Sequence, residues 1–116
     1  MRGNAVLNFR NQSIVITGGS SGLGLELARH LAREGARLTL IARDRDRLER
    51  AAQELRARPG GATVRIESLD VRDEAAVQAC MQHIAETDGR IDMLINSAGI
   101  LREGHIESLP LKDFRE

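Results

Sequence analysis

The sequence contains very few aromatic residues, with two Phe and neither Trp nor Tyr. The core of a folded domain must therefore be aliphatic, built from Leu, Ile, Val and Ala. The sequence also has a single cysteine, Cys80, which excludes an internal disulfide and a zinc site made from several cysteines. Because Cys80 lies on the apolar stripe of an expected helix, we interpret it as a core residue rather than a nucleophile.

The chain also lacks an excess of charge of either sign and a long apolar run. Its 17 basic and 17 acidic residues give a net charge of zero, whereas proteins that bind nucleic acid through bulk electrostatics are usually basic. No apolar run is long enough to cross a membrane, and the N-terminal stretch MRGNAVLNFRNQS has no signal-peptide core. These absences predict a soluble, cytoplasmic protein without a nucleic-acid partner, and 116 residues make at most one domain.

Short apolar runs alternate with amphipathic segments along the chain. This alternation is typical of an α/β fold, in which helices cover a parallel sheet. Right-handed crossovers then predict a Rossmann-type doubly wound sheet with the strand order 3-2-1-4. The third run, residues 63–71, is more polar than the others, which suits a strand at the edge of the sheet. The expected strands are 13–17, 37–42, 63–71 and 91–96, the expected helices are 22–34, 44–57 and one capped by Asp73, and a further helix opens at 111–116.

The stretch TGGSSGLG lies between the first expected strand and the first expected helix. The start of a helix presents unpaired N–H groups and a partial positive charge, which together suit a phosphate. Gly18, Gly22 and Gly24 allow positive φ and a close approach of the backbone to a pyrophosphate, while Ser20 and Ser21 add hydroxyl donors. The alternative is a strand-to-helix turn with a purely structural role.

Further polar residues follow the other strands, at the edge of the sheet where ligands of such folds bind. Arg43 follows the second strand and Arg47 lies one helical turn later, which favours the 2′-phosphate of NADP over the free ribose hydroxyl of NAD. Asp70 lies at the end of the third strand and can accept a hydrogen bond from the adenine amino group, and Asn96 can bridge strand ends. The alternative to a cofactor role is that Arg43 and Arg47 are solvated charges on a helix face. For Asp70 the alternative is an ordinary residue at the end of a strand.

Three motifs resemble those of the short-chain dehydrogenase/reductase family. They are the glycine motif TGxxxGxG, an Asp-Val pair at the end of the third strand, and an NNAG motif in which this chain has Ser in place of the second Asn. The resemblance extends from about residue 12 to residue 116. Within the family, the chain is most similar to the NADPH-dependent 3-ketodihydrosphingosine reductases, in the stretches GGSSG, ARDRDRL and IDMLINSAG. The matching residues are Thr17, Gly18, Gly22, Gly24, Asp70, Val71 and the stretch 96–99.

The resemblance implies an NADP-dependent oxidoreductase that binds NADPH, reduces a ketone such as 3-ketodihydrosphingosine, and forms a homo-oligomer when full length. Independently of the resemblance, no metal site is expected, because His30, His83 and His105 are dispersed and not paired at metal-ligand spacing. The expected cofactor-binding residues are Gly18, Ser20, Ser21, Gly22, Leu23, Gly24, Arg43, Arg47, Asp70, Val71, Asn96, Ala98 and Gly99.

The catalytic residues of the family are a Ser, a Tyr-x-x-x-Lys pair and an Asn on the helix after the fourth strand, with the tyrosine as general acid. This chain has no tyrosine, and its only lysine is Lys112. We therefore expect residues 1–116 to be the N-terminal dinucleotide-binding portion of a single Rossmann domain, without the C-terminal catalytic half and inactive alone. The alternative is a stand-alone nucleotide-binding module that acts as a sensor or partner subunit.

Overall fold

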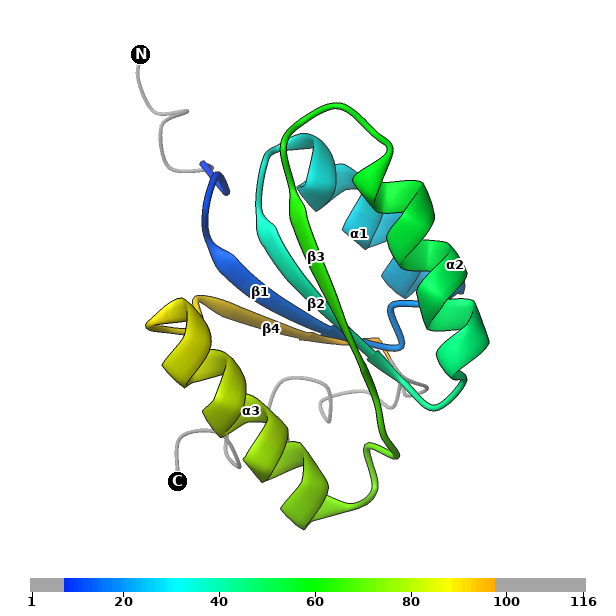
Figure 1. Ribbon diagram of the computed structural model, residues 1–116, viewed down its shortest axis with the longest axis vertical. Coiled ribbons are helices and arrows are strands. Elements are labelled where there is room, and N and C mark those ends of the chain that lie inside the picture. Colours follow the sequence, from blue (N-terminus) through cyan, green and yellow to red (C-terminus); the bar gives the residue numbers. More distant parts are fainter. Residues whose placement is uncertain (1–7, 98–116) are drawn as a thin grey trace.

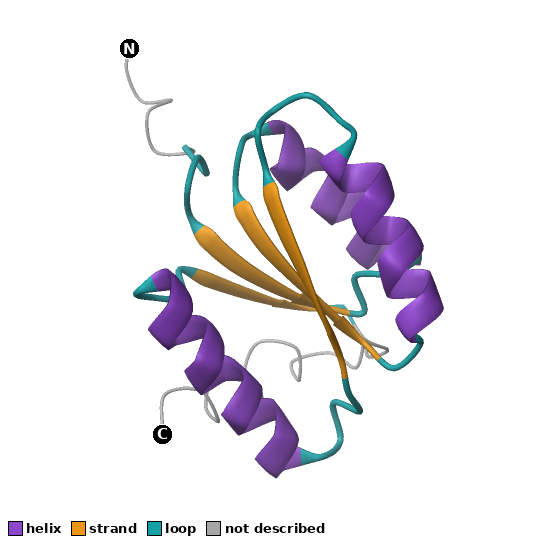
Figure 2. Ribbon diagram, in the orientation of Figure 1, coloured by secondary structure: helices purple, strands orange, loops and turns teal. Residues whose placement is uncertain are grey.

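The computed structural model describes residues 8–97, which form one four-stranded parallel sheet with helices on both faces (Figure 2). The sheet has the order β3-β2-β1-β4, with α1 and α2 on one face and α3 on the other (Figure 1). This confirms the predicted α/β fold and strand order. In chain order the elements are β1 (Ser13–Thr17), α1 (Gly22–Arg33), β2 (Arg37–Ala42), α2 (Arg45–Arg56), β3 (Thr63–Ser68), α3 (Glu74–Asp88) and β4 (Met93–Asn96).

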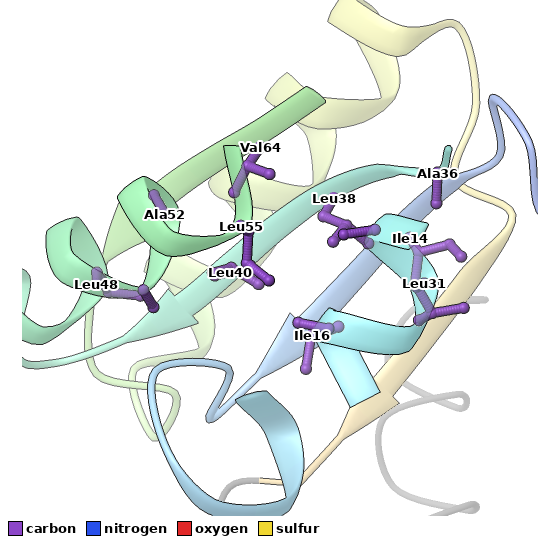
Figure 3. Packing of buried hydrophobic residues seen from close by; sticks show 13 residues of the cluster. Ile14, Ile16, Leu31, Ala36, Leu38, Leu40, Leu48, Ala52, Leu55 and Val64 are labelled. Carbon is purple, nitrogen blue, oxygen red and sulfur yellow. The ribbon is translucent and has the colours of Figure 1, made fainter. Parts of the chain in front are cut away.

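The two central strands are buried on both faces, which explains why their sequences read as continuous apolar runs. Alternate residues of β1 enter different clusters: Ile14 and Ile16 pack with α1 and α2, whereas Val15 packs with α3. Figure 3 shows the first cluster between the two helices and the sheet. Its buried members are Ile14, Ile16, Ala28, Leu31, Ala32, Ala36, Leu38, Leu40, Leu48, Ala51, Ala52, Leu55 and Val64, all aliphatic as predicted.

The predicted helices have the expected ends and faces. Asp44 and Asp73 cap α2 and α3, each side chain accepting a hydrogen bond from a backbone N–H in the first turn. Gly35 and Gly89, which follow α1 and α3, adopt positive φ of 83° and 84°, a conformation that favours glycine. Leu48, Ala51, Ala52 and Leu55 form the buried face of α2, and Cys80 lies with Met81 and Ile84 in the second cluster.

Two strands are shorter than predicted. The run 63–71 pairs with β2 only as far as Ser68, because Asp70 instead forms a turn in which its carboxylate accepts the backbone N–H of Arg72. The run 91–96 starts pairing with β1 at Met93. Just before it, the backbone N–H of Asp92 still donates to the carbonyl oxygen of Ser13, while the Asp92 carboxylate accepts the N–H of Ser13. A side-chain hydrogen bond thus replaces a backbone one at the start of β4. The helix predicted at 111–116 lies outside the described residues.

A buried carboxylate joins α3 to the sheet at the amino-terminal edge. The Asp88 side chain is 2% exposed and forms an ion pair of 2.7 Å with Arg65 and a longer one of 3.8 Å with Arg37. The Ser13 hydroxyl donates a third contact of 2.6 Å to the same carboxylate. Hydrogen bonds from Arg65 are the main cause that lowers the pKa of Asp88, so the carboxylate is ionised at neutral pH.

Candidate functional site

The glycine loop connects β1 to α1 at the carboxyl-terminal edge of the sheet. Gly18 and Gly22 adopt positive φ of 72° and 57°, so the chain reverses direction in a conformation that other residues rarely adopt. The N–H of Gly18 donates a bond of 2.7 Å to the carbonyl oxygen of Ile41 in β2, which fixes the start of the loop. The sequence motif therefore forms a tight strand-to-helix turn.

Gly24 allows α1 to lie unusually close to the end of β1. A Cβ atom at this position would lie 2.2 Å from the carbonyl oxygen of Gly18 and 2.5 Å from the hydroxyl oxygen of Ser97. Ser97 in turn donates two hydrogen bonds to the carbonyl oxygen of Thr17, from its N–H (3.1 Å) and from its hydroxyl (2.6 Å). Packing alone thus gives a reason for a glycine at position 24.

The N-terminus of α1 is open and carries no compensating negative charge. Its first turn contains no acidic residue, and the side chain of the capping residue Ser21 makes no capping hydrogen bond. A Cβ atom at Gly22 would meet no other atom of residues 8–97 within 4 Å, so this part of the chain leaves space beside the helix start. Leu23 is 68% exposed there. Free N–H groups, the helix dipole and open space together suit an anionic ligand.

Basic residues lie beside this loop, after β2. Arg43 is exposed, and within residues 8–97 its side chain makes no hydrogen bond or ion pair. Arg47 is also exposed and forms a long ion pair of 3.7 Å with Asp44. Such an exposed pair stabilises the fold little, so both guanidinium groups can engage an external anion.

Asp70 lies after β3, as the sequence predicted, but its carboxylate is already engaged. The Arg72 side chain donates two hydrogen bonds to it, of 3.1 and 2.9 Å. These bonds are the main cause that lowers the pKa of Asp70 to about 2, and the charge of Arg43 adds a small contribution. Asp70 is therefore an ionised acceptor, and Val71 next to it is partly exposed.

Asn96 ends β4 and contacts the end of β1. The hydroxyl of Thr17 donates a hydrogen bond of 2.7 Å to its side-chain carbonyl oxygen, so the strand ends are linked as the sequence suggested. Ala98 and Gly99, the other residues predicted after this strand, lie outside the described residues.

An open groove of about 270 Å³ extends from the glycine loop between α1 and α2. Ser20 and Ser21 line its loop end, and Arg47 and Arg50 line it from α2. Arg50 is not among the residues predicted from the sequence, which assigned only Arg43 and Arg47 to this place. The available signal was spacing: Arg47, Arg50 and Glu54 recur at intervals of three and four residues, which places them on one side of a helix.

Other kinds of site have no support in the described part of the chain. Between residues 8 and 97, no three or more His, Cys, Asp or Glu side chains lie together as they would to hold a metal ion. His30 and His83 are exposed on different helices, and His105 lies outside the described residues. No helix formed within the same range is both long and apolar enough to span a membrane.

Comparison with known proteins gives consistent matches at the level of sequence and of fold. Oxidoreductase UcpA of Salmonella typhimurium is 41% identical over 102 residues, which are 88% of this chain and 38% of that protein. L-Sorbose reductase of Gluconobacter frateurii, solved with NADPH and L-sorbose, is 36% identical with a TM-score of 0.74, over 91% of this chain and 40% of that one. NAD⁺-bound xylitol dehydrogenase is 33% identical with a TM-score of 0.73, over 79% of this chain and 35% of that one.

The chain thus spans less than half the length of these relatives, and they include proteins solved with either nicotinamide cofactor. The family model described as short chain dehydrogenase matches residues 12–116, which is nearly the whole chain. The strand order, the glycine loop and these matches agree with one another. The chain belongs to the short-chain dehydrogenase family.

Proposed function

We propose that this chain binds NADPH at the carboxyl-terminal edge of the sheet and forms the cofactor-binding part of an NADP-dependent oxidoreductase. The observation that carries the proposal is the N-terminus of α1, which has no acidic residue in its first turn and which the described residues leave open at Gly22. A pyrophosphate there would accept hydrogen bonds from backbone N–H groups in a field of positive sign.

The residues around this helix start fit a phosphorylated dinucleotide. Gly18, Gly22 and Gly24 form the turn, and the hydroxyls of Ser20 and Ser21 add donors beside the pyrophosphate. The remaining proposed cofactor-binding residues, from the glycine loop and the other strand ends, are Leu23, Arg43, Arg47, Asp70, Val71, Asn96, Ala98 and Gly99.

The choice of NADP over NAD rests on the residues after β2. Arg43 has no partner of its own within residues 8–97, so its guanidinium is available to a 2′-phosphate. A planar guanidinium binds a phosphate through two parallel hydrogen bonds, which a ribose hydroxyl cannot match. Asp44, which would otherwise suit a ribose hydroxyl, caps α2 and contacts Arg47.

The proposed reaction is the reduction of a ketone, and 3-ketodihydrosphingosine is the first substrate to test because of the sequence resemblance. When bound, NADPH supplies the hydride. The part of this chain is to bind and orient the cofactor, because it contains no tyrosine and its one lysine is Lys112. We propose that the tyrosine and lysine that complete the reaction belong to the remainder of a full-length protein.

Calorimetric titration of the chain with NADPH and with NADH tests this proposal. We expect NADPH to bind more tightly, and an R43Q variant to lose about tenfold in affinity for NADPH while its affinity for NADH changes little. The matched control is R90Q, which removes the same charge at the amino-terminal edge of the sheet, where Arg90 pairs with Asp92. Equal or tighter binding of NADH would refute the choice of NADP, and no binding of either would refute the proposal as a whole.

A further inference from the structure

The groove between α1 and α2 is lined by four side chains that can donate hydrogen bonds to an anion. Arg47 and Arg50 project from α2 and face Ser20 and Ser21 of the glycine loop across the groove. Glu54, one turn further along α2, is the only acidic residue that residues 8–97 contribute to its lining. Whether the groove attracts an anion therefore depends on what neutralises Glu54.

Glu54 is held away from the groove's arginines by two other basic residues. Arg29 of α1 donates two hydrogen bonds to its carboxylate, of 2.6 and 3.1 Å, and Arg58 donates two more, of 3.2 and 2.9 Å. Glu26 binds the remaining side of the Arg29 guanidinium at 2.8 Å, so Arg29 is fixed in place. The charge of Glu54 is thus compensated from outside the groove.

This arrangement has a consequence for Arg50. Arg50 and Glu54 are four residues apart on α2, a spacing at which an arginine and a glutamate commonly pair. In this structure Glu54 pairs with Arg29 and Arg58 instead, and within residues 8–97 the Arg50 side chain makes no hydrogen bond or ion pair. The groove therefore contains an unpaired guanidinium beside the paired Arg47.

We propose that Arg50 binds the 2′-phosphate of NADP in this groove, and that Arg29 is a positioning residue that keeps Glu54 from occupying Arg50. The inference rests on the proposed function, because it assumes that the dinucleotide lies on the glycine loop. Ser20 and Ser21 line both that loop and the groove, so a ribose attached to a pyrophosphate at the start of α1 lies at the groove's mouth. Specificity for NADP is then shared between Arg43 after β2 and Arg50 in the second turn of α2.

The test compares two ligands that represent only the adenosine half of the cofactor. Adenosine 2′,5′-bisphosphate carries the phosphate in question and adenosine 5′-monophosphate lacks it, so the ratio of their dissociation constants isolates the contribution of the groove. We expect R50Q to weaken binding of the bisphosphate about tenfold and leave the monophosphate unchanged, and R50K to retain most of the preference. The control R33Q removes an equal charge from the far end of α1 and should change neither constant.

The role of Arg29 is tested by a pair of variants. R29Q releases one partner of Glu54, and we expect the preference for the bisphosphate to fall about threefold as Glu54 turns to Arg50. The double variant R29Q/E54Q should restore that preference, although it lacks the link between α1 and α2 just as R29Q does. A purely structural effect of Arg29 would persist in the double variant and would lower the affinity for both ligands.

The outcomes separate this inference from the proposed function. If the unmodified chain prefers the bisphosphate but R50Q keeps that preference, the assignment of Arg50 is wrong while the NADP proposal stands. If R50Q weakens both ligands equally, Arg50 has only a structural role and the inference is again wrong. If the unmodified chain binds the two ligands equally, the choice of NADP fails, and the inference fails with it.

Discussion

Replacing Gly24 by alanine tests whether the glycine loop depends on the close approach between α1 and the end of β1. The added Cβ would lie 2.2 Å from the carbonyl oxygen of Gly18, whereas ordinary contacts begin at 3.4 Å. Because that oxygen belongs to the backbone, the clash cannot be relieved by a side-chain rotation. The helix start must move away from the strand, which also displaces the hydroxyl of Ser97, 2.5 Å from the same Cβ.

The cost of this displacement can be worked out from its parts. Overpacking of a tight site costs about 3 kcal/mol at the upper end of its usual range. Weakening the hydrogen bond of 2.6 Å between Ser97 and Thr17 adds about 1 kcal/mol. Alanine favours a helix over glycine by about 1 kcal/mol, which offsets part of the loss. We therefore expect G24A to lower the free energy of unfolding by about 3 kcal/mol.

Urea unfolding followed by circular dichroism measures this change, with G22A as the matched control. Gly22 is a second glycine of the same loop, but a Cβ there would meet no other atom of residues 8–97 within 4 Å. Among these residues, the expected cost of alanine at position 22 therefore comes from its φ of 57°. That conformation costs about 1 kcal/mol. If G24A destabilises the chain no more than G22A does, the close approach at Gly24 does not determine the loop, and the reasoning is refuted.

The other predictions concern α3. D88N should lower the free energy of unfolding by about 2 kcal/mol, because the amide leaves the charge of the half-buried Arg65 without its partner. The pKa of Asp88 is lowered in the folded state, so the stability that its carboxylate contributes is complete above the ordinary pKa of 3.8 and is lost as the pH falls below that value. The free energy of unfolding of D88N should lack this acid-induced loss. Identical pH profiles of unfolding for D88N and the unmodified chain would contradict the assignment. Burial raises the pKa of Cys80 to about 11. At pH 8 a thiol reagent should therefore react roughly a hundredfold more slowly with the folded chain than with the urea-unfolded chain. Equal rates would show that the thiol is accessible in the folded chain.

The fold was predictable because its determinants are local in the sequence. The apolar runs, the glycine after α1 and the aspartate before α3 each act over a few residues, and they specify element type and order. The predicted end of β3 and the predicted start of β4 were wrong, and at both places an aspartate side chain accepts a backbone N–H, which an apolar pattern does not encode.

The candidate site was predictable only in part, for the same physical reason. The glycine loop has a motif of its own, so its geometry followed from spacing. The availability of Arg50 depends on Arg29, a residue of another helix that binds Glu54, and no pattern within α2 reveals that contact. The engagement of Asp70 by Arg72 was not predicted either, because it depends on the conformation of a turn that follows β3.

The double hydrogen bond from Ser97 to the carbonyl of Thr17 has a consequence for the order of folding during synthesis. The loop is made early, but the residue that anchors its first strand lies 80 positions later in the chain. A nascent chain that has not yet added β4 therefore lacks both donors to Thr17 and the Ser97 contact beside Gly24. Long-range contacts of this kind form late. The loop consequently reaches its final shape only when the fourth strand joins the sheet, so ligand binding would report on completion of the sheet.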